Sequence, residues 1–299
     1  MRHRFLICDV FTHQRFGGNQ LAVLPEASGL SDVQMQQIAR EFNFSESTFV
    51  LPSATCTRQV RIFTPVAELP FAGHPNVGTA FVLATIGELG EIGAATTVTF
   101  DEKAGRVPVR IERQGTGFRC VLSAPESLSI GQAIDPTLIA AAVSVSPSDI
   151  VTTTHRPQVA SVGLPFVFAE VRDRAVLGSM KVNVAGFEAI GAQGVPPSVL
   201  FYTRQGEDFD IRARMFSPLD GVLEDPATGS ANCALGAMLC HYHDAGEGTF
   251  SRRIAQGVEM GRPSVLMAEA DKKGGRVTAA RIGGDSVLVC DGYITAQTE

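Results

Sequence analysis

No hydrophobic run in the 299-residue sequence reaches the length of a membrane span, and none is free of glycine, proline or charge. The N-terminus begins with charged residues but lacks the long apolar segment of a signal peptide. An excess of positive charge is also missing, because the net charge is -6. We therefore expect neither a membrane nor a nucleic acid as a partner.

The sequence also lacks the motifs of common cofactor, metal and nucleophile sites. Its six cysteines are scattered and form no C-x-x-C pair, which favours reduced thiols and a cytoplasmic location. Phosphate-loop and G-x-S-x-G motifs are absent, and residues 115–117 lack the third glycine of a dinucleotide site. Cys240, His241 and His243 do not share one helix face, so zinc is not expected. We expect no cofactor and no metal.

What the sequence does contain is the pattern of a mixed α+β protein. Ser31 and Gln34 form the capping box of a helix with apolar residues at Val33, Ile38 and Phe42. Alternating apolar and polar residues between turn signals indicate many strands. The expected strands are residues 4–11, 21–24, 47–52, 58–64, 96–101, 106–113, 117–123, 159–170, 198–203, 210–217, 264–269, 276–283 and 286–295.

Two further helices are apolar on almost every face. They are expected from about Pro75 to Ile86 and from about Ser230 to His243. Because a helix without a polar face must be covered on all sides, we expect a curved sheet around each one. Their first turns would still present unpaired N–H groups and the positive end of the helix dipole.

Both helices belong to an internal repeat. Arg61-Ile62-Phe63-Thr64-Pro65 matches Arg214-Met215-Phe216-Ser217-Pro218 at an offset of 153 residues. After a three-residue insertion, Gly73 aligns with Gly229 at the starts of the two apolar helices. A strand, a loop and a glycine-led helix therefore recur in the same order.

The repeat predicts two copies of one domain. Asn76 and Asn232 align in the same register as the two glycines. We place the first domain at residues 1–115, with the strand at 286–299 returning to it, and the second at 116–285. No low-complexity linker separates the two halves.

We expect the two helix starts to face one anion-binding cleft. Gly73 and Gly229 would let a ligand approach the backbone, and Ser230 would cap its helix or contribute a hydroxyl group. Two helix N-termini can hold a carboxylate without arginine or lysine. The alternative is that both glycines only let the chain enter a buried helix.

Glu46, His74 and Asp225 are the candidate acid–base groups. Burial between Phe44 and Phe49 would raise the pKa of Glu46 and suit it to proton transfer, whereas an exposed loop carboxylate is the alternative. The helix dipole would keep His74 neutral, although a structural hydrogen bond would also explain it. Asp225 is placed to pair with a substrate amine or with the helix dipole.

Several motifs occur in a fixed order over nearly the whole chain. They are Asp9-Val10-Phe11, Gly18-Asn19, Leu21-Ala22-Val23, Phe44-Ser45-Glu46-Ser47-Thr48-Phe49-Val50-Leu51, Arg61-Ile62-Phe63-Thr64-Pro65, Glu68-Leu69-Pro70-Phe71-Ala72-Gly73-His74-Pro75, Glu224-Asp225-Pro226-Ala227-Thr228-Gly229-Ser230-Ala231 and Gln256-Gly257-Val258-Glu259-Met260-Gly261-Arg262-Pro263-Ser264. Together they resemble the PhzF family of phenazine-biosynthesis isomerases.

The resemblance implies the diaminopimelate epimerase-like fold. In this α+β fold, two pseudo-symmetric domains each wrap a curled β-sheet around a central helix. The family resemblance also implies a homodimer and an isomerase that needs no cofactor. Such an enzyme shifts a proton within a small carboxylate substrate such as dihydro-3-hydroxyanthranilate or a relative.

The resemblance also implies a role for each candidate residue. Glu46 is the acid–base residue that takes a proton from one carbon and returns it to another. His74 and Asp225 are its partners around the polar groups of the substrate. The backbone N–H groups expected to hold the carboxylate are those of Gly73, Gly229 and Ser230.

Two positions limit the alternatives. Epimerases of this fold use a thiol at each helix start, but Ala72 and Thr228 occupy those places here. Neither side chain can remove a proton from carbon, so racemisation by two thiols is not expected. The remaining alternatives are a non-catalytic PhzF-like protein that binds a ligand or another protein, and an amino-acid epimerase, which Ala72 and Thr228 disfavour. Gln20 stands where the family usually has proline, which affects a turn rather than the chemistry.

Overall fold

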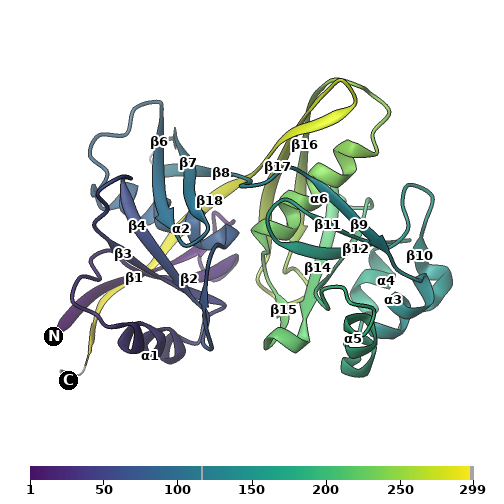
Figure 1. The fold of residues 1–299 in the computed structure, drawn as a ribbon, viewed down its shortest axis with the longest axis horizontal. Helices are drawn as coiled ribbons and strands as arrows, with labels where there is room; N and C mark the ends of the chain where they lie inside the picture. The colour runs from purple at the N-terminus through teal and green to yellow at the C-terminus, as the bar shows by residue number, and fades with distance from the viewer. Residues whose placement is uncertain (116, 297–299) are drawn as a thin grey trace. The chain divides into compact units, whose positions relative to one another are not determined.

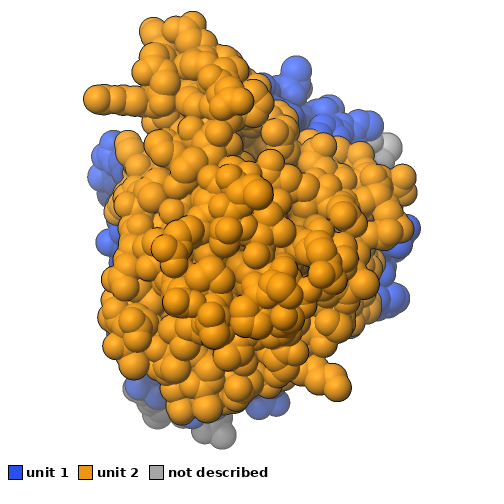
Figure 2. Space-filling view, turned by 90° about the vertical axis from the view of Figure 1, so that its right-hand side faces the viewer, with its two compact units in different colours: residues 1–123, 283–299 blue, residues 124–282 orange. Residues whose placement is uncertain are grey.

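The computed structural model describes residues 1–115 and 117–296 (Figure 1). The chain divides into two compact units, which are residues 1–123 with 283–299 and residues 124–282. Figure 2 colours the residues of each unit separately. Residue 116, at the expected domain boundary, and residues 297–299 of the expected last strand lie outside the described residues. Within the described ranges, every helix is too short or too polar to cross a membrane.

The first unit contains two helices and a series of paired strands. The helices are α1 (Asp32–Phe42) and α2 (Gly73–Thr85). The strands are β1 (Arg2–Val10), β2 (Asn19–Leu24), β3 (Glu46–Leu51), β4 (Arg58–Phe63), β5 (Glu68–Leu69), β6 (Ala95–Glu102), β7 (Gly105–Gln114), β8 (Gly117–Ser123) and the latter part of β18 (Arg276–Thr295).

The strands of the first unit pair in a closed series. The order is β1, β2, β3, β4, β6, β7, β8 and β18, and β18 pairs again with β1. The β2–β3 and β4–β6 pairs are parallel, and the other pairs with a known register are antiparallel. A closed series leaves no free sheet edge and provides an inner face that a helix can fill.

Helix α2 fills the inner face of this sheet, as its apolar sequence predicts. All residues of α2 from Gly73 to Ala84 are buried, and the helix contacts β1, β2, β3, β7 and β8. Gly78 permits the close approach, because a Cβ atom there would lie 2.6 Å from Leu21 Cδ2 and 2.7 Å from Val10 Cγ2.

Helix α1 confirms the predicted capping box, and it confirms the predicted buried face at Ile38 and Phe42 but not at Val33. The backbone N–H of Gln34 donates to Ser31 Oγ, and the Ser31 N–H donates to Gln34 Oε1 at 2.8 Å. Val33 is 61% exposed, whereas Met35, Ile38 and Ala39 are buried. A residue in the first turn projects away from the sheet here, and the buried stripe begins two residues later.

The second unit has the same core arrangement and additional helices. Its strands are β9 (Ser129–Ala133), β10 (Ile150–Val151), β11 (Gln158–Ser161), β12 (Pro165–Val171), β13 (Val199–Thr203), β14 (Ile211–Ser217), β15 (Val222–Asp225), β16 (Gly248–Gln256), β17 (Ser264–Lys273) and the start of β18. Its helices are α3 (Pro136–Ala142), α4 (Arg174–Ser179), α5 (Val184–Gly191) and α6 (Gly229–His241).

Helix α6 takes the central place that α2 has in the first unit. It is buried along most of its length and contacts β11, β12, β16 and β17. Gly236 allows contact with the sheet, because a Cβ atom there would lie 2.8 Å from Ala268 Cβ. Helices α3, α4 and α5 instead surround a separate apolar cluster that includes Phe187 and Phe201.

The sequence prediction is wrong at two places in the strand pattern. The single strand expected at 159–170 is two strands, β11 and β12, and Gly163 between them has a φ of 143° that a regular strand does not adopt. The strands expected at 276–283 and 286–295 form one long strand, β18. The two glycines at 283 and 284 look like a break in the sequence, but they continue the strand. Helices α3 to α5 and strands β5, β9, β10, β15 and β16 were not predicted.

The helical glycine at position 78 provides a test of the packing around α2. We expect Gly78→Ala to lower the free energy of unfolding by about 1–2 kcal/mol, because crowding against Leu21 and Val10 outweighs the gain in helix propensity. Gly178→Ala in α4 is the matched control, since no atom of the described neighbours lies within 4 Å of its added Cβ. Urea denaturation of both variants would measure the difference. An equal or higher stability of Gly78→Ala would contradict this packing.

Candidate functional site

The first half-site lies at the start of α2. Ala72 is the N-cap residue, with an extended backbone, and the helix begins at Gly73. Asn76 Nδ2 donates a hydrogen bond to the Ala72 carbonyl at 2.9 Å, so a side chain one turn later fixes the entry of the helix. His74 lies in the same first turn and is buried.

Glu46 and His74 lie side by side in this half-site. Glu46 begins β3, and its Oε2 atom lies 3.4 Å from His74 Nδ1. Asn19 Nδ2, at the start of β2, lies 3.4 Å from the same ring nitrogen. The side chain of Glu46 is only 17% exposed. Glu46 is therefore a partly buried strand residue beside an imidazole, not an exposed loop carboxylate.

Burial keeps the imidazole of His74 uncharged. It lowers the pKa of His74 to about 3, although the Gln20 backbone carbonyl acts in the opposite direction. His74 Nε2 has no hydrogen-bond partner that meets the usual geometry among the described residues. The neutral state agrees with the sequence prediction, and loss of water on burial favours it. The uncharged Nδ1 of His74 can accept a hydrogen bond from Glu46 when the Glu46 carboxyl group is protonated.

The second half-site lies at the start of α6. Thr228 is the N-cap, so Ser230 is the second residue of the helix and does not cap it as the sequence suggested. Asn232 Nδ2 donates to the Thr228 carbonyl at 2.9 Å, as Asn76 does to Ala72 in the first unit. The Thr228 hydroxyl donates to Asp225 Oδ2 at 2.5 Å.

Gln256 joins the loop before α6 to the helix itself. It is fully buried at the end of β16. Its Nε2 donates to the Asp225 carbonyl at 2.7 Å and to Thr228 Oγ1 at 3.1 Å. Its Oε1 accepts from Asn232 Nδ2 at 2.6 Å and from the Thr228 N–H at 3.3 Å. No role for Gln256 was predicted from the sequence. Its only signal in the sequence was its place at the start of the family-like motif at residues 256–264.

Equivalent ion pairs support the loop that leads to each helix. Arg61 makes two hydrogen bonds of 2.8 Å to the carboxylate of Glu68. Arg214 makes two hydrogen bonds of 2.8 Å to the carboxylate of Glu224. Paired arginine–carboxylate contacts fix direction as well as distance. The repeat thus includes the polar contacts that hold each helix start.

The N-cap residues of α2 and α6 are Ala72 and Thr228, and neither carries a thiol. Cys233, one turn into α6, is the nearest cysteine to Asp225 along the chain, and burial raises its pKa to about 12. It therefore remains a protonated thiol at neutral pH. Among the described residues, no three His, Cys, Asp or Glu side chains form a group that could hold a metal ion, and this includes the segment from Cys240 to His243.

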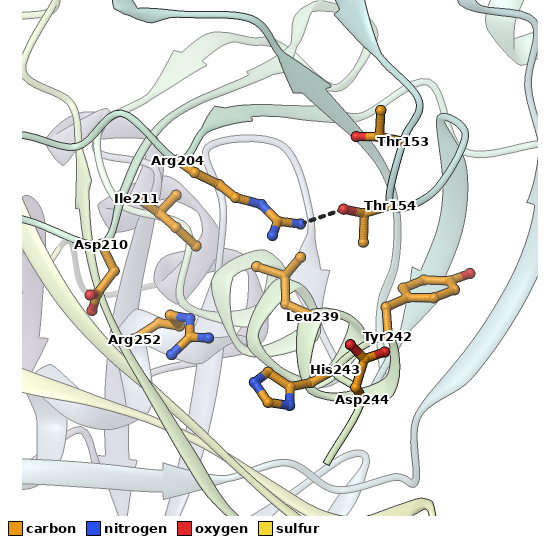
Figure 3. Close-up of a pocket in the computed structure, with 10 residues that line it drawn as sticks. All are labelled: Thr153, Thr154, Arg204, Asp210, Ile211, Leu239, Tyr242, His243, Asp244 and Arg252. Atoms are coloured by element: carbon orange, nitrogen blue, oxygen red, sulfur yellow. Dashed lines mark hydrogen bonds between the residues drawn. The ribbon is translucent and has the colours of Figure 1, made fainter. Parts of the chain in front are cut away.

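A separate cavity of about 540 Å³ lies in the second unit (Figure 3). It is lined by Leu239 at the C-terminal end of α6, by Tyr242 just after the helix and by residues of other segments such as Arg204, and none of the predicted site residues lines it. A helix of 13 residues is about 20 Å long, so the cavity and Ser230 are at opposite ends of α6. Arg204 points into it and donates to Thr154.

Comparisons with known proteins identify the family. The PhzC-PhzF family model, described as phenazine biosynthesis-like protein, matches residues 8–292. A trans-2,3-dihydro-3-hydroxyanthranilate isomerase of Pseudomonas aeruginosa is 35% identical, with 97% of this chain and 98% of that protein covered. An uncharacterized isomerase of Mesorhizobium japonicum is 37% identical with the same coverage of 97% and 98%. The crystal structure of a Bacillus anthracis phenazine biosynthesis protein of the PhzF family has a TM-score of 0.90 at 25% identity and covers 99% of both chains.

The two-unit α+β architecture and these matches define an isomerase of the diaminopimelate epimerase-like fold. The chain belongs to the PhzC-PhzF family of phenazine biosynthesis-like proteins. This confirms the family and fold that the sequence motifs resemble.

The low pKa of His74 predicts how stability depends on pH. As the pH falls from 7 to 5, the unfolded chain binds a proton at this residue and the folded chain does not, so stability is lost on the acid side. Its contribution decreases by about 2 kcal/mol over this range. Urea denaturation would measure the free energy of unfolding of wild type and of His74→Gln at both pH values. Relative to the variant, wild type should lose that amount of stability between pH 7 and pH 5. An identical difference at pH 7 and pH 5 would contradict a buried neutral His74.

Proposed function

We propose that this isomerase shifts a proton within a small carboxylate of the dihydro-3-hydroxyanthranilate class and needs no cofactor. The observation that carries the proposal is the contact of 3.4 Å between Glu46 and the neutral ring of His74. A carboxyl group beside an uncharged imidazole can both take and return a proton. The relative in Pseudomonas aeruginosa is named for an isomerisation of this substrate.

In the proposed reaction, Glu46 is the one group that moves the proton. As a carboxylate it removes a proton from one carbon, and the electron pair of that bond enters the conjugated system of the substrate. As a carboxylic acid it returns a proton to a second carbon, so no net proton is gained or lost. His74 shares a hydrogen bond with Glu46 and holds its carboxyl group in position.

Binding is proposed to use both helix starts. The N–H groups of Gly73, Gly229 and Ser230 would hold the substrate carboxylate, because first-turn N–H groups are unpaired and lie at the positive end of the helix dipole. Asp225 would receive the substrate's amino group. Its position is held by Thr228 and Gln256, which leaves little freedom for the carboxylate. The proposal also includes a homodimer in the cytoplasm, which light scattering and cell fractionation would test.

The test is deuterium exchange with dihydro-3-hydroxyanthranilate in heavy water. Wild type should consume the compound and place deuterium at the new C–H position. Glu46→Gln keeps the shape of the side chain but removes the base, so we expect the rate to fall about 10³-fold. Glu41→Gln on the exposed face of α1 is the matched control and should retain the wild-type rate.

Other outcomes would separate the alternatives. If neither this compound nor a panel of small unsaturated acids and amino acids shows exchange that depends on Glu46, the proposed catalysis is wrong. A non-catalytic binding protein would keep its cellular activity in Glu46→Gln and lose it in Gly229→Val. An epimerase would invert a stereocentre and would need a base in addition to Glu46.

A further inference from the structure

The strand register shows which residues of the two units are equivalent. The repeat offset of 153 residues places Arg58 of β4 at the same position as Ile211 of β14. Arg58 pairs in parallel with Phe100 of β6, and Ile211 pairs in parallel with Ile254 of β16. Strands β6 and β16 are therefore equivalent, and both end two residues after this pair.

The equivalent strand ends carry different side chains. Strand β6 ends at Glu102, and β16 ends at Gln256. In the second unit, Gln256 accepts a hydrogen bond from Asn232. In the first unit, Asn76 occupies the position of Asn232, and it is the side chain whose hydrogen bonding affects Glu102. An ionisable acid thus faces α2 where an amide faces α6.

The surroundings of Glu102 favour the protonated acid. The residue is only 8% exposed, and burial raises its pKa to about 8, although the amide of Asn76 acts in the opposite direction. Both carboxyl oxygens of Glu102 and Oδ1 of Asn76 are buried without a well-formed hydrogen bond among the described residues. A carboxylate would leave a charge buried there, whereas the neutral acid, like the glutamine amide, offers both a hydrogen-bond donor and an acceptor.

The charged groups on the neighbouring segments are engaged elsewhere. Lys103, the next residue in the chain, donates to Glu68 at 2.5 Å, and Arg61 of β4 binds the same carboxylate. His74 of α2 is neutral. On β4 and β6, Arg58 binds Glu88 and Asp101 accepts from Ser53. On β7, Arg106 is exposed, Arg110 pairs with Glu112, and Arg113 donates to the Ile92 carbonyl.

We propose that Glu102 is a positioning residue of the first half-site, which acts as a neutral carboxylic acid in the role that Gln256 has in the second. It holds Asn76, and Asn76 holds the Ala72 carbonyl at the entry of α2. Gly73 and His74 come directly after Ala72 in the chain. The geometry of the half-site therefore depends on whether Glu102 is protonated. This inference rests on the proposed function only in assuming that Gly73 and His74 take part in the isomerisation.

The contact between Glu102 and Asn76 is expected to be lost at alkaline pH, where Glu102 ionises. Above its folded pKa, the carboxylate would leave a buried charge beside the helix and draw water towards the helix entry. Below it, the acid preserves the contact. We therefore expect kcat/KM of the wild type to fall as the pH rises above about 8, with the loss removed in Glu102→Gln. Glu102→Ala, which has neither donor nor acceptor, should lose at least about tenfold in kcat/KM at every pH.

Two measurements test the proposal without any substrate. The first is the unfolding equilibrium as a function of pH. Since the folded pKa lies above the unfolded value of 4.5, the folded chain keeps a proton that the unfolded chain has lost. Wild type should lose stability relative to Glu102→Gln as the pH rises towards 8, with the unfolding constant changing up to about tenfold per pH unit. Parallel pH profiles of the two proteins would overturn the proposal.

The second measurement is the NMR signal of the His74 ring, which a purely structural role of Glu102 would not move. We expect it to shift with a midpoint near pH 8 in wild type and to stay constant in Glu102→Gln. The same shift in both proteins, or none in either, would overturn the proposal. Gln256→Glu is a second variant should Glu102→Gln not fold, and it should acquire the alkaline loss of stability in the second unit. If both profiles behave as expected and no isomerase activity is found, the proposed function fails and the positioning role stands.

Discussion

Each unit of this protein depends on one helix that has no polar face. Such a helix is stable only when apolar neighbours cover it on every side, and the strands around α2 and α6 provide that cover. The first turn of each helix then carries the unpaired N–H groups. The constraint that builds the core therefore also creates the polar half-sites.

The same frame carries different chemistry in its two copies. Asn76 and Asn232 hold the two helix entries in the same way, and equivalent arginine–carboxylate pairs support both loops. Beyond this frame, the first copy brings Glu46 to a neutral His74, whereas the second fixes Asp225 through a threonine and a glutamine. The two units therefore share the same frame but carry different reactive side chains.

Much of the frame could be predicted from the sequence because it depends on local patterns. The apolar helices and the repeat are visible as periodicity, and the capping box of α1 needs only residues three apart. The contact of Glu46 with His74 could be inferred only from the family resemblance. The roles of Gln256 and Glu102 depend on which strands pair in parallel, and no local pattern contains that register. The burial that lowers the pKa of His74 likewise depends on the tertiary packing around α2.

The central claim is that a single base, Glu46, carries the proton between two carbons. The most direct measurement uses substrate labelled with deuterium at the carbon that loses its proton, turned over in ordinary water. A single carboxyl group shielded beside His74 should return part of the label to the product. Complete loss of the label to solvent, together with full turnover by Glu46→Gln, would contradict the account.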